Sequence, residues 1–305
     1  MKESLNITSN LEDRECPGNT PYVVSADVEL LLGDWAEREG FRIPGSQFFI
    51  QQRSNFSEFM KGIYPGFEMV SEKELSSGIK KVIDLSGLLA VSLDGVYYRS
   101  VPGFNIARIV DETGNDKGLG KRAGSDSILS QFRQVKALGI SQVALVDDVI
   151  FSGELMERVC NVLEKVGIDV PFVAAGIGIG DGVQKLSQNG RSVVCVREYK
   201  EVIDEICERD FYPGVPLSGR RIRGKENIGA PYILPFGNPV GWASIPEKSK
   251  VIFSKFCLDQ TIQLFGVIEE YSSKSVTCLD VERGVIGMPR DNTRFTDFLA
   301  SFMLI

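Results

Sequence analysis

The chain has 305 residues, of which 43% are hydrophobic and 25% are charged, a balance typical of soluble globular proteins. Its net charge of −7 argues against a general attraction to nucleic acid or to anionic membrane surfaces. The sequence contains no histidine, which excludes Ser-His-Asp triads, histidine general bases and histidine metal sites. We therefore expect a small-molecule partner, with no nucleic acid and no membrane.

The N-terminus and the cysteines indicate the compartment. Residues 1–5 lack the apolar core of a signal peptide, and no run reaches the roughly 18 to 20 apolar residues of a membrane helix. The cysteines contain no Cys-x-x-Cys pair, which argues against a zinc site or a disulfide framework. We expect a cytoplasmic protein in which they stay reduced: Cys16, Cys160, Cys195, Cys207, Cys257 and Cys278.

Residues 1–78 contain several Pro-Gly turns, and we assign them to an N-terminal subdomain that covers the core. The apolar spacing between Ser25 and Glu39 predicts a helix with Ser25 as its N-cap and Gly40 at its end. Residues 47–52 are a candidate short strand. No pattern in this part indicates chemistry.

Apolar and β-branched runs begin after Lys80 and predict strands over 82–85, 88–93, 96–101 and 106–110. Asp94 and Gly95 form a typical hairpin turn between two of them. Arg99 begins a Pro-Gly turn that can contact an anion, with an exposed hairpin end as the alternative. Residues 111–124 contain four glycines and three cations, and we predict a mobile loop followed by a helix over 127–138.

The segment 143–153 carries the strongest functional signal. Its apolar run is typical of a strand buried on both faces of a parallel sheet, and it ends in adjacent carboxylates, Asp147 and Asp148. A turn with Ser152 and Gly153 precedes a helix predicted over 154–166. Ligands of such sheets bind outside the carboxyl ends of the strands, and a helix N-terminus attracts phosphate. The order predicts a ribose-phosphate site, with a solvated turn or helix cap as the alternative.

The segment resembles the phosphoribosyl pyrophosphate motif of type I phosphoribosyltransferases, in which an apolar strand, two acidic residues and a Ser/Thr-Gly turn follow one another. The resemblance implies that Asp147 and Asp148 contact the ribose and, indirectly, Mg²⁺. It also implies that the following residues wrap the 5′-phosphate: Val149, Ile150, Phe151, Ser152 and Gly153.

The resemblance implies an α/β fold with a parallel central sheet flanked by helices, over residues 79–221, with an N-terminal addition and a C-terminal extension over 222–305. It implies transfer of the 5-phosphoribosyl group from phosphoribosyl pyrophosphate to a nitrogenous base, with Mg²⁺, release of pyrophosphate and a homodimer as one arrangement. Lys117, Lys121 and Arg122 would act as the catalytic loop that covers the pyrophosphate, and Arg99 would contact it. This chemistry needs no histidine, because cations stabilise the leaving group.

Where the family usually has a small residue and a threonine after the glycine, this chain has Glu154 and Leu155. A carboxylate at this position opposes a bound phosphate. A non-catalytic protein that binds phosphoribosyl pyrophosphate or a nucleotide on the same fold therefore stays open as the alternative function.

Further strands are predicted over 170–175 and 192–197, with a helix between them that supports a parallel sheet. The glycines over 176–182 alternate and do not form the G-x-G-x-x-G fingerprint, which disfavours a dinucleotide-dependent oxidoreductase. Within 207–221, Arg209 and Asp210 are candidates for acceptor recognition or for a structural ion pair. Residues 251–270 predict a docking helix, and 275–280 and 284–288 predict the last strands.

Overall fold

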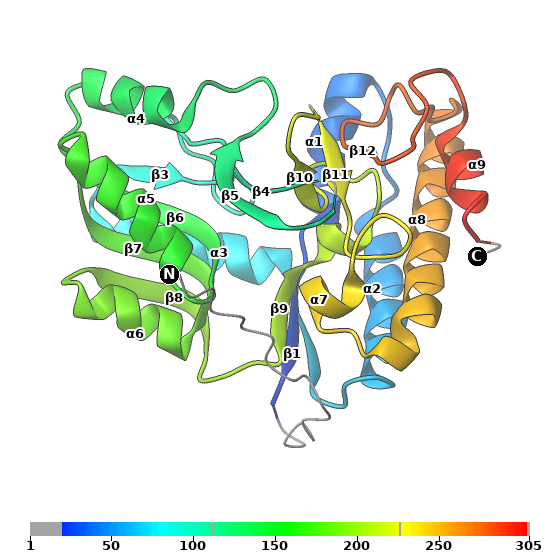
Figure 1. Ribbon diagram of the computed structural model, residues 1–305, viewed down its shortest axis with the longest axis horizontal. Coiled ribbons are helices and arrows are strands. Elements are labelled where there is room, and N and C mark those ends of the chain that lie inside the picture. The colour runs from blue at the N-terminus through cyan, green and yellow to red at the C-terminus, as the bar shows by residue number, and fades with distance from the viewer. Residues whose placement is uncertain (1–19, 112, 226, 304–305) are drawn as a thin grey trace, which may run out of the picture.

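The computed structural model describes residues 20–111, 113–225 and 227–303. Helices and strands alternate along the chain and form three sheets with helices packed on them (Figure 1). The helices are α1 (Val28–Glu39), α2 (Ser46–Lys61), α3 (Glu72–Ser86), α4 (Ile128–Ala137), α5 (Glu154–Lys165), α6 (Gly180–Gln188), α7 (Pro239–Ala243), α8 (Lys250–Ser272) and α9 (Phe295–Ala300), with the 3-10 turns η1 (Glu208–Phe211) and η2 (Glu247–Ser249). The strands are β1 (Tyr22–Ser25), β2 (Phe67–Val70), β3 (Ala90–Ser92), β4 (Ile106–Val110), β5 (Asp116–Lys121), β6 (Gln142–Ile150), β7 (Asp169–Ile179), β8 (Ser192–Tyr199), β9 (Asp204–Cys207), β10 (Arg220–Ile222), β11 (Ile228–Ala230) and β12 (Gly284–Val285).

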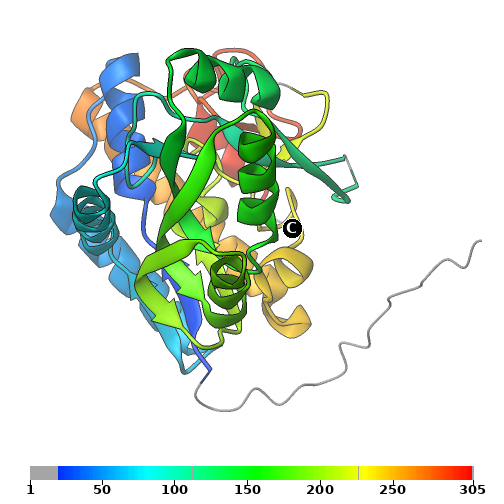
Figure 2. The ribbon, with the colours of Figure 1, turned by 90° about the vertical axis from the view of Figure 1, so that its left-hand side faces the viewer.

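A four-stranded parallel sheet in the order β3-β6-β7-β8 confirms the predicted parallel sheet flanked by helices. Helix α3 covers one face, and α5 and α6 cover the other (Figure 2). Alternate residues of β6 enter different core clusters: Ala144 and Val146 face one side, and Val143 and Leu145 face the other. Burial on both faces explains why this strand is an uninterrupted apolar run.

A second parallel sheet has the order β2-β1-β9. It pairs strands from the first 78 residues with β9, which follows the four-stranded sheet in sequence. A third, mixed sheet has the order β12-β11-β10-β4-β5 and pairs β4 with strands of the C-terminal part. Elements of all three predicted segments thus share sheets, and the boundaries at 78 and 221 stay predictions.

Several predicted elements are wrong in type. Residues 47–52 lie in α2, whose buried Phe49, Phe56 and Met60 follow a helical period longer than that window. Residues 82–85 form the last turn of α3, where Leu75, Ile79 and Ile83 repeat every four residues along the buried face.

The predicted hairpin at Asp94-Gly95 is also wrong, because β3 pairs in parallel with β6 and residues 96–101 form no strand. Residues 116–121 are strand β5 rather than loop, since they pair with β4 across a turn anchored by Asp111. Residues 275–280 form no strand apart from the bridge of Thr277 to Arg294. Ser25 ends β1, and Asp27 is the N-cap of α1, which ends at Gly40 as predicted.

Within the described residues, the helical segment Glu247–Ser272 is long and apolar enough to cross a membrane, but half of its apolar window is buried inside the protein. Phe253, Leu264 and Phe265 of this segment are fully buried in the main core. Packing of a core helix accounts for this composition. The cysteines within the described residues are unpaired, as predicted, and Cys16 and residues 1–5 lie outside them.

Candidate functional site

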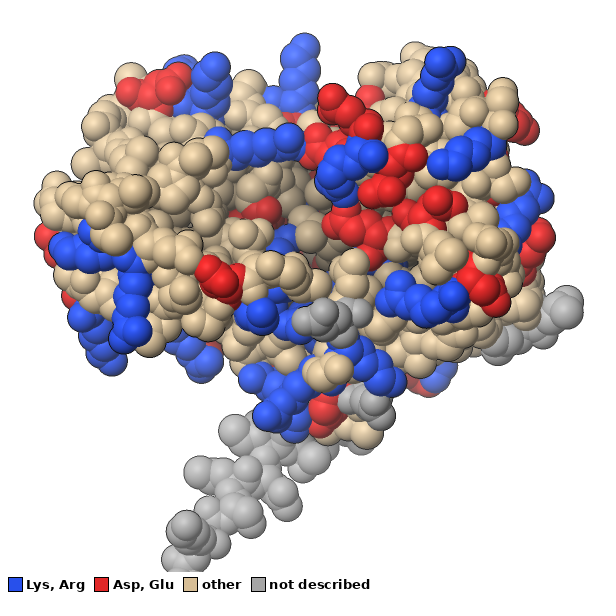
Figure 3. All heavy atoms as spheres, turned by 90° about the horizontal axis from the view of Figure 1, so that it is seen from above, with Lys and Arg blue, Asp and Glu red and all other residues tan. Residues whose placement is uncertain are grey.

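A cavity of about 850 Å³ opens beside the carboxyl end of the four-stranded sheet. The end of β6, strands β4, β5 and β9, helix α1 and the C-terminal part contribute to its wall. Figure 3 looks onto a hollow in this face of the molecule, with acidic side chains gathered on one side of it and basic ones near its rim. The cationic side chains that line the cavity are all arginines: Arg38, Arg99, Arg108, Arg122, Arg209, Arg220 and Arg283.

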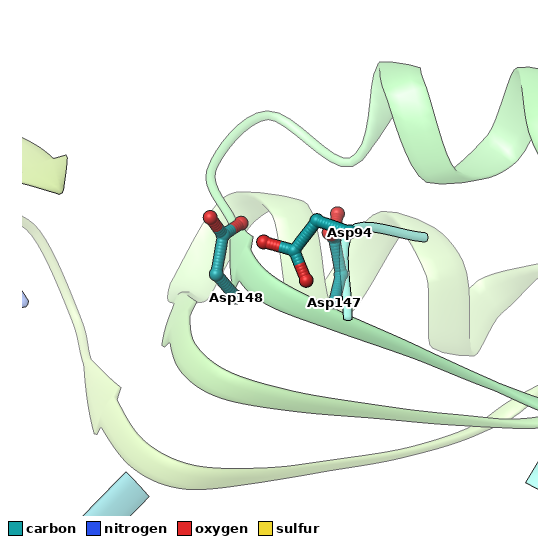
Figure 4. Close-up of side chains that lie close together, drawn as sticks. All are labelled: Asp94, Asp147 and Asp148. Atoms are coloured by element: carbon teal, nitrogen blue, oxygen red, sulfur yellow. The ribbon is translucent and has the colours of Figure 1, made fainter. Parts of the chain in front are cut away.

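Three carboxyl groups meet on the cavity wall (Figure 4). Asp147 and Asp148 lie near the carboxyl end of β6, and Asp94 reaches them from the segment that follows β3. One carboxylate oxygen of each residue lies within 4.8 Å of the others. The spacing is compatible with one shared cation.

Burial and mutual repulsion give these carboxyl groups different charges. Burial, together with the charges of Asp148 and Asp94, raises the pKa of Asp147 well above its usual range. Burial and the charge of Asp148 raise the pKa of Asp94 to about 6. Burial also opposes ionisation of Asp148, but Arg209 and hydrogen bonds outweigh it and lower its pKa. Burial thus disfavours the charged form of Asp147, whereas Arg209 favours the charged form of Asp148.

Arg209 is the cation that holds Asp148 in place. Its guanidinium group donates to Asp148 Oδ2 at 2.8 Å and pairs with Asp27, which also accepts the Arg209 backbone N–H at 2.9 Å. The Cys207 thiol donates to the same Asp148 oxygen at 3.2 Å. The predicted alternative of a structural ion pair therefore applies to Arg209, but its partners are Asp27, Asp148 and, at 3.8 Å, Asp94.

The neighbouring residues of Arg209 fix this arrangement. The Glu208 carboxylate accepts the backbone N–H groups of Asp27 and Val28 at 3.1 and 3.2 Å, and so caps the first turn of α1. Asp210 lines the cavity and accepts the backbone N–H of Gly219 at 2.7 Å. The segment after β9 thus connects α1 with the carboxyl end of β6.

The turn after β6 brings the start of α5 to the cavity. Gly153 has φ +72°, and a Cβ there would lie 2.8 Å from the carbonyl oxygen of Gly182. Phe151 and Ser152 line the cavity, and the Ser152 hydroxyl accepts the backbone N–H of Glu154 at 3.4 Å. Close packing of the turn against the start of α6 holds this loop in place and requires glycine on both sides.

The other predicted phosphate-binding residues divide between cavity and core. Val149 lines the cavity, whereas Ile150 is buried in the core. Arg122 lines the cavity, and its Nε donates to the carbonyl oxygen of Ile106 at 3.0 Å. Arg99 stands at the cavity wall and pairs with Asp34 of α1.

The two lysines of the predicted catalytic loop are not among the residues that line the cavity. Lys117 pairs with Asp111 at 2.9 Å near the β4-β5 turn, and Lys121 donates to the carbonyl oxygen of Ser125 at 2.5 Å. The structure therefore brings Arg99 and Arg122 to the cavity and leaves the lysines engaged elsewhere.

Sequence analysis missed several residues of the cavity wall. Asp94 was predicted as part of a hairpin turn, and that prediction did not indicate that it lies near Asp147 and Asp148. Arg108 stands in a predicted strand without a motif around it, and Arg220 and Trp242 are brought to the cavity by β10 and α7. A pattern confined to neighbouring residues cannot reveal these long-range approaches.

No protein-family model and no curated protein matches the chain significantly. Among solved structures, it is similar to adenine phosphoribosyltransferase from Thermoanaerobacter pseudethanolicus, with 15% identity and a TM-score of 0.26 over 41% of this chain and 80% of that one. Orotate phosphoribosyltransferase from Aeropyrum pernix gives 15% identity and a TM-score of 0.24 over 41% and 68%. Orotate phosphoribosyltransferase from Mycobacterium tuberculosis H37Rv, in complex with inorganic phosphate, gives 10% identity and a TM-score of 0.26 over the same shares. Similarity at this level does not establish the family.

Proposed function

We propose that the chain binds phosphoribosyl pyrophosphate in this cavity and transfers its 5-phosphoribosyl group to a nitrogenous base, releasing pyrophosphate. One observation carries the proposal: the Asp147-Asp148 pair and the turn at Phe151 and Ser152 open on the same cavity. Carboxyl groups bind vicinal sugar hydroxyls, and a turn leading into a helix N-terminus receives a phosphate. A site for sugar hydroxyls and a site for phosphate, side by side at the end of one strand, suit a phosphorylated pentose.

The charges of the cavity suit the reaction. The bond between ribose C1 and the pyrophosphate oxygen breaks while the bond to the acceptor nitrogen forms, so positive charge develops on the ribose ring. The ionised carboxylate of Asp148, held by Arg209, stabilises that charge. Arg122 and Arg99, which line the same cavity, receive the charge of the departing pyrophosphate.

A divalent cation fits the carboxyl cluster. Asp94 Oδ2 is buried, has no hydrogen-bond partner within the described residues and lies 3.8 Å from Arg209 Nη2, and the carboxyl group faces its two neighbours (Figure 4). Asp94, Asp147 and Asp148 would hold Mg²⁺ directly or through water. The ion would supply positive charge for the ribose hydroxyls and the pyrophosphate.

Two observations favour the alternative of binding without transfer. Lys117 and Lys121 are engaged away from the cavity, and Glu154 places an exposed carboxylate at the start of α5. A protein that only senses phosphoribosyl pyrophosphate needs no group to cover the leaving pyrophosphate.

The test is a pyrophosphate-release assay on the full chain with phosphoribosyl pyrophosphate, Mg²⁺ and a panel of purine and pyrimidine bases. We expect release with at least one base and its loss in Asp147→Asn. Asp169→Asn is the matched control, since this exposed carboxylate lies at the start of β7. Binding of phosphoribosyl pyrophosphate without release over the whole panel would support the sensor, and absence of binding would refute both functions.

A further inference from the structure

A second part of the cavity wall combines arginines with aromatic rings. Arg220 of β10 lies over the Trp242 ring of α7, with Cζ 4.7 Å from the ring centroid, and 5.4 Å from the centroid of Tyr232. Its Nε donates to the Tyr232 hydroxyl at 3.3 Å. All three side chains line the cavity, and Arg108 of β4 lines it as well.

This wall is packed in a fixed geometry. A Cβ at Gly237 or at Gly114 would each lie 2.8 Å from the Trp242 ring, so the backbone approaches that ring from two segments. The backbone N–H of Tyr232 donates to the carbonyl oxygen of Asp210 at 2.7 Å. A wall held by backbone contacts is preorganised for a ligand.

The wall offers hydrogen-bond donors in excess. Within the described part of the chain, neither Arg108 nor Arg220 forms an ion pair. The nearby carboxylates each accept a hydrogen bond at one oxygen: Asp204 accepts the Ser244 hydroxyl at 2.8 Å, and Asp210 accepts the Gly219 amide at 2.7 Å. Guanidinium groups donate and never accept, so this wall suits ligand oxygens better than ligand amino groups.

Arg108 lies close to both parts of the cavity. It lines the same cavity as Asp147 and Asp148 on the ribose side and as Tyr232 and Asp210 on the aromatic side. A ligand ring in contact with Arg108 therefore lies in the same cavity as the carboxyl groups that would bind the ribose.

We propose that Arg108, Arg220, Tyr232 and Trp242 form the acceptor subsite, and that it selects planar nitrogen heterocycles with carbonyl or carboxylate oxygens over their amino-substituted counterparts. This inference rests on the proposed function. The ring packs against Trp242 and Tyr232, and its oxygens accept hydrogen bonds from the two guanidinium groups. An amino group at the same position would find no acceptor on either guanidinium group.

The fluorescence of Trp242 can report the binding of a base. The chain has two tryptophans, and Trp35 is 1% exposed in the core while Trp242 lines the cavity. Tryptophan fluorescence of the full chain is titrated with the matched pairs uracil and cytosine, and hypoxanthine and adenine, with and without phosphoribosyl pyrophosphate and Mg²⁺. We expect the oxo member of at least one pair to bind at least about tenfold more tightly, since a lost hydrogen bond to a charged donor has that magnitude.

Variants test whether this wall causes the selectivity for oxo over amino bases. Arg108→Gln should weaken binding of the oxo member at least about tenfold and leave the amino member unchanged. Arg133→Gln, at an exposed position of α4, is the control and should bind as the wild type does. Trp242→Phe should abolish the fluorescence change while calorimetry still detects binding.

The outcomes separate this inference from the proposed function. Oxo-selective binding without pyrophosphate release supports the subsite and refutes the transfer. Pyrophosphate release with adenine or cytosine preferred, or with selectivity unchanged in Arg108→Gln, overturns the subsite alone. The absence of a saturable response to every base, under both conditions, also overturns it.

Discussion

Asp147 and Asp148 are adjacent in sequence and differ in their partners. Asp148 accepts hydrogen bonds from Arg209 and Cys207, whereas the Asp147 carboxyl group has neighbouring carboxyl groups and a pKa raised by burial. Both carboxyl groups belong to the cluster with Asp94, but Asp148 also accepts hydrogen bonds from the Arg209 network. The pair thus combines one carboxylate held by Arg209 with one carboxyl group whose charged form burial disfavours.

The first prediction follows from this difference. Asp147→Asn replaces a buried carboxyl group whose charged form is disfavoured by burial and by neighbouring carboxylates, so the free energy of unfolding should change by less than about 1 kcal/mol. Asp148→Asn weakens a buried charged hydrogen bond to Arg209 and should cost about 2 kcal/mol. Urea denaturation of both variants at pH 7 measures the difference. A larger loss for Asp147→Asn would contradict these charge assignments.

The pH dependence of stability gives a second prediction. Burial and the charge of Asp148 raise the pKa of Glu205 to about 8. A carboxyl group with a raised pKa binds its proton more tightly in the folded state than in the unfolded state, so the free energy of unfolding falls as the pH rises between the two pKa values. We therefore expect stability to fall from about pH 5 to about pH 8.

Glu205→Gln isolates one contributor to that slope. Its amide oxygen can still accept the hydrogen bond from the Ser25 hydroxyl, which lies 2.8 Å from the carboxylate in the wild type. The variant should show a shallower decline over the same pH interval. Stability that rises over this interval in the wild type would contradict the prediction, because it would mean that Glu205 is ionised when folded.

At the scale of elements, the helices and strands whose apolar residues recur at a regular spacing could be predicted from the sequence. The strand and helix of 143–165 and the long helix α8 repeat apolar residues in a way that few other structures permit. The sequence-based prediction was wrong at α3, where Ile83 ends a helical stripe but also begins a short apolar run typical of a strand. The sequence-based prediction was also wrong at β5, because its glycines and lysines are typical of a loop and the strand is only half buried.

The turn before α5 gives a prediction at this scale. Gly153→Ala would force a Cβ to within 2.8 Å of the Gly182 carbonyl oxygen at φ +72°, whereas Gly139→Ala, at φ +80°, would meet nothing within 4 Å. We expect Gly139→Ala to cost about 1 kcal/mol and Gly153→Ala at least about 2 kcal/mol. Thermal unfolding compares the two variants. Equal losses would show that the turn adjusts freely and does not pack as described.

At the scale of the molecule, the cavity is a product of long-range folding. The acidic pair and its turn are contiguous, so the sequence alone could locate them and propose a ribose-phosphate site. Asp94, Arg108 and Trp242 reach the cavity from three separate segments. Asp27 and Arg209, which pair with each other, are 182 residues apart in the sequence. Such approaches depend on how three sheets pack, which local patterns do not encode.

Arg209 provides a prediction for the whole molecule, because it ties α1 to the four-stranded sheet. Arg209→Gln would leave the buried carboxyl groups of Asp27 and Asp148 without their cation and should cost about 3–5 kcal/mol. Adding Asp27→Asn should recover part of that loss, and a double-mutant cycle by urea denaturation measures the coupling. Strictly additive losses would contradict a direct pairing.

The central claim is that the carboxyl pair and the turn bind opposite ends of one phosphorylated sugar. Calorimetric titration of phosphoribosyl pyrophosphate with Mg²⁺ into the full chain tests it most directly. We expect saturable binding of one molecule per chain, weakened at least about tenfold in Asp147→Asn and in Gly153→Ala, with Asp169→Asn unchanged. Absence of binding to the wild type, or equal binding by all variants, would contradict the account.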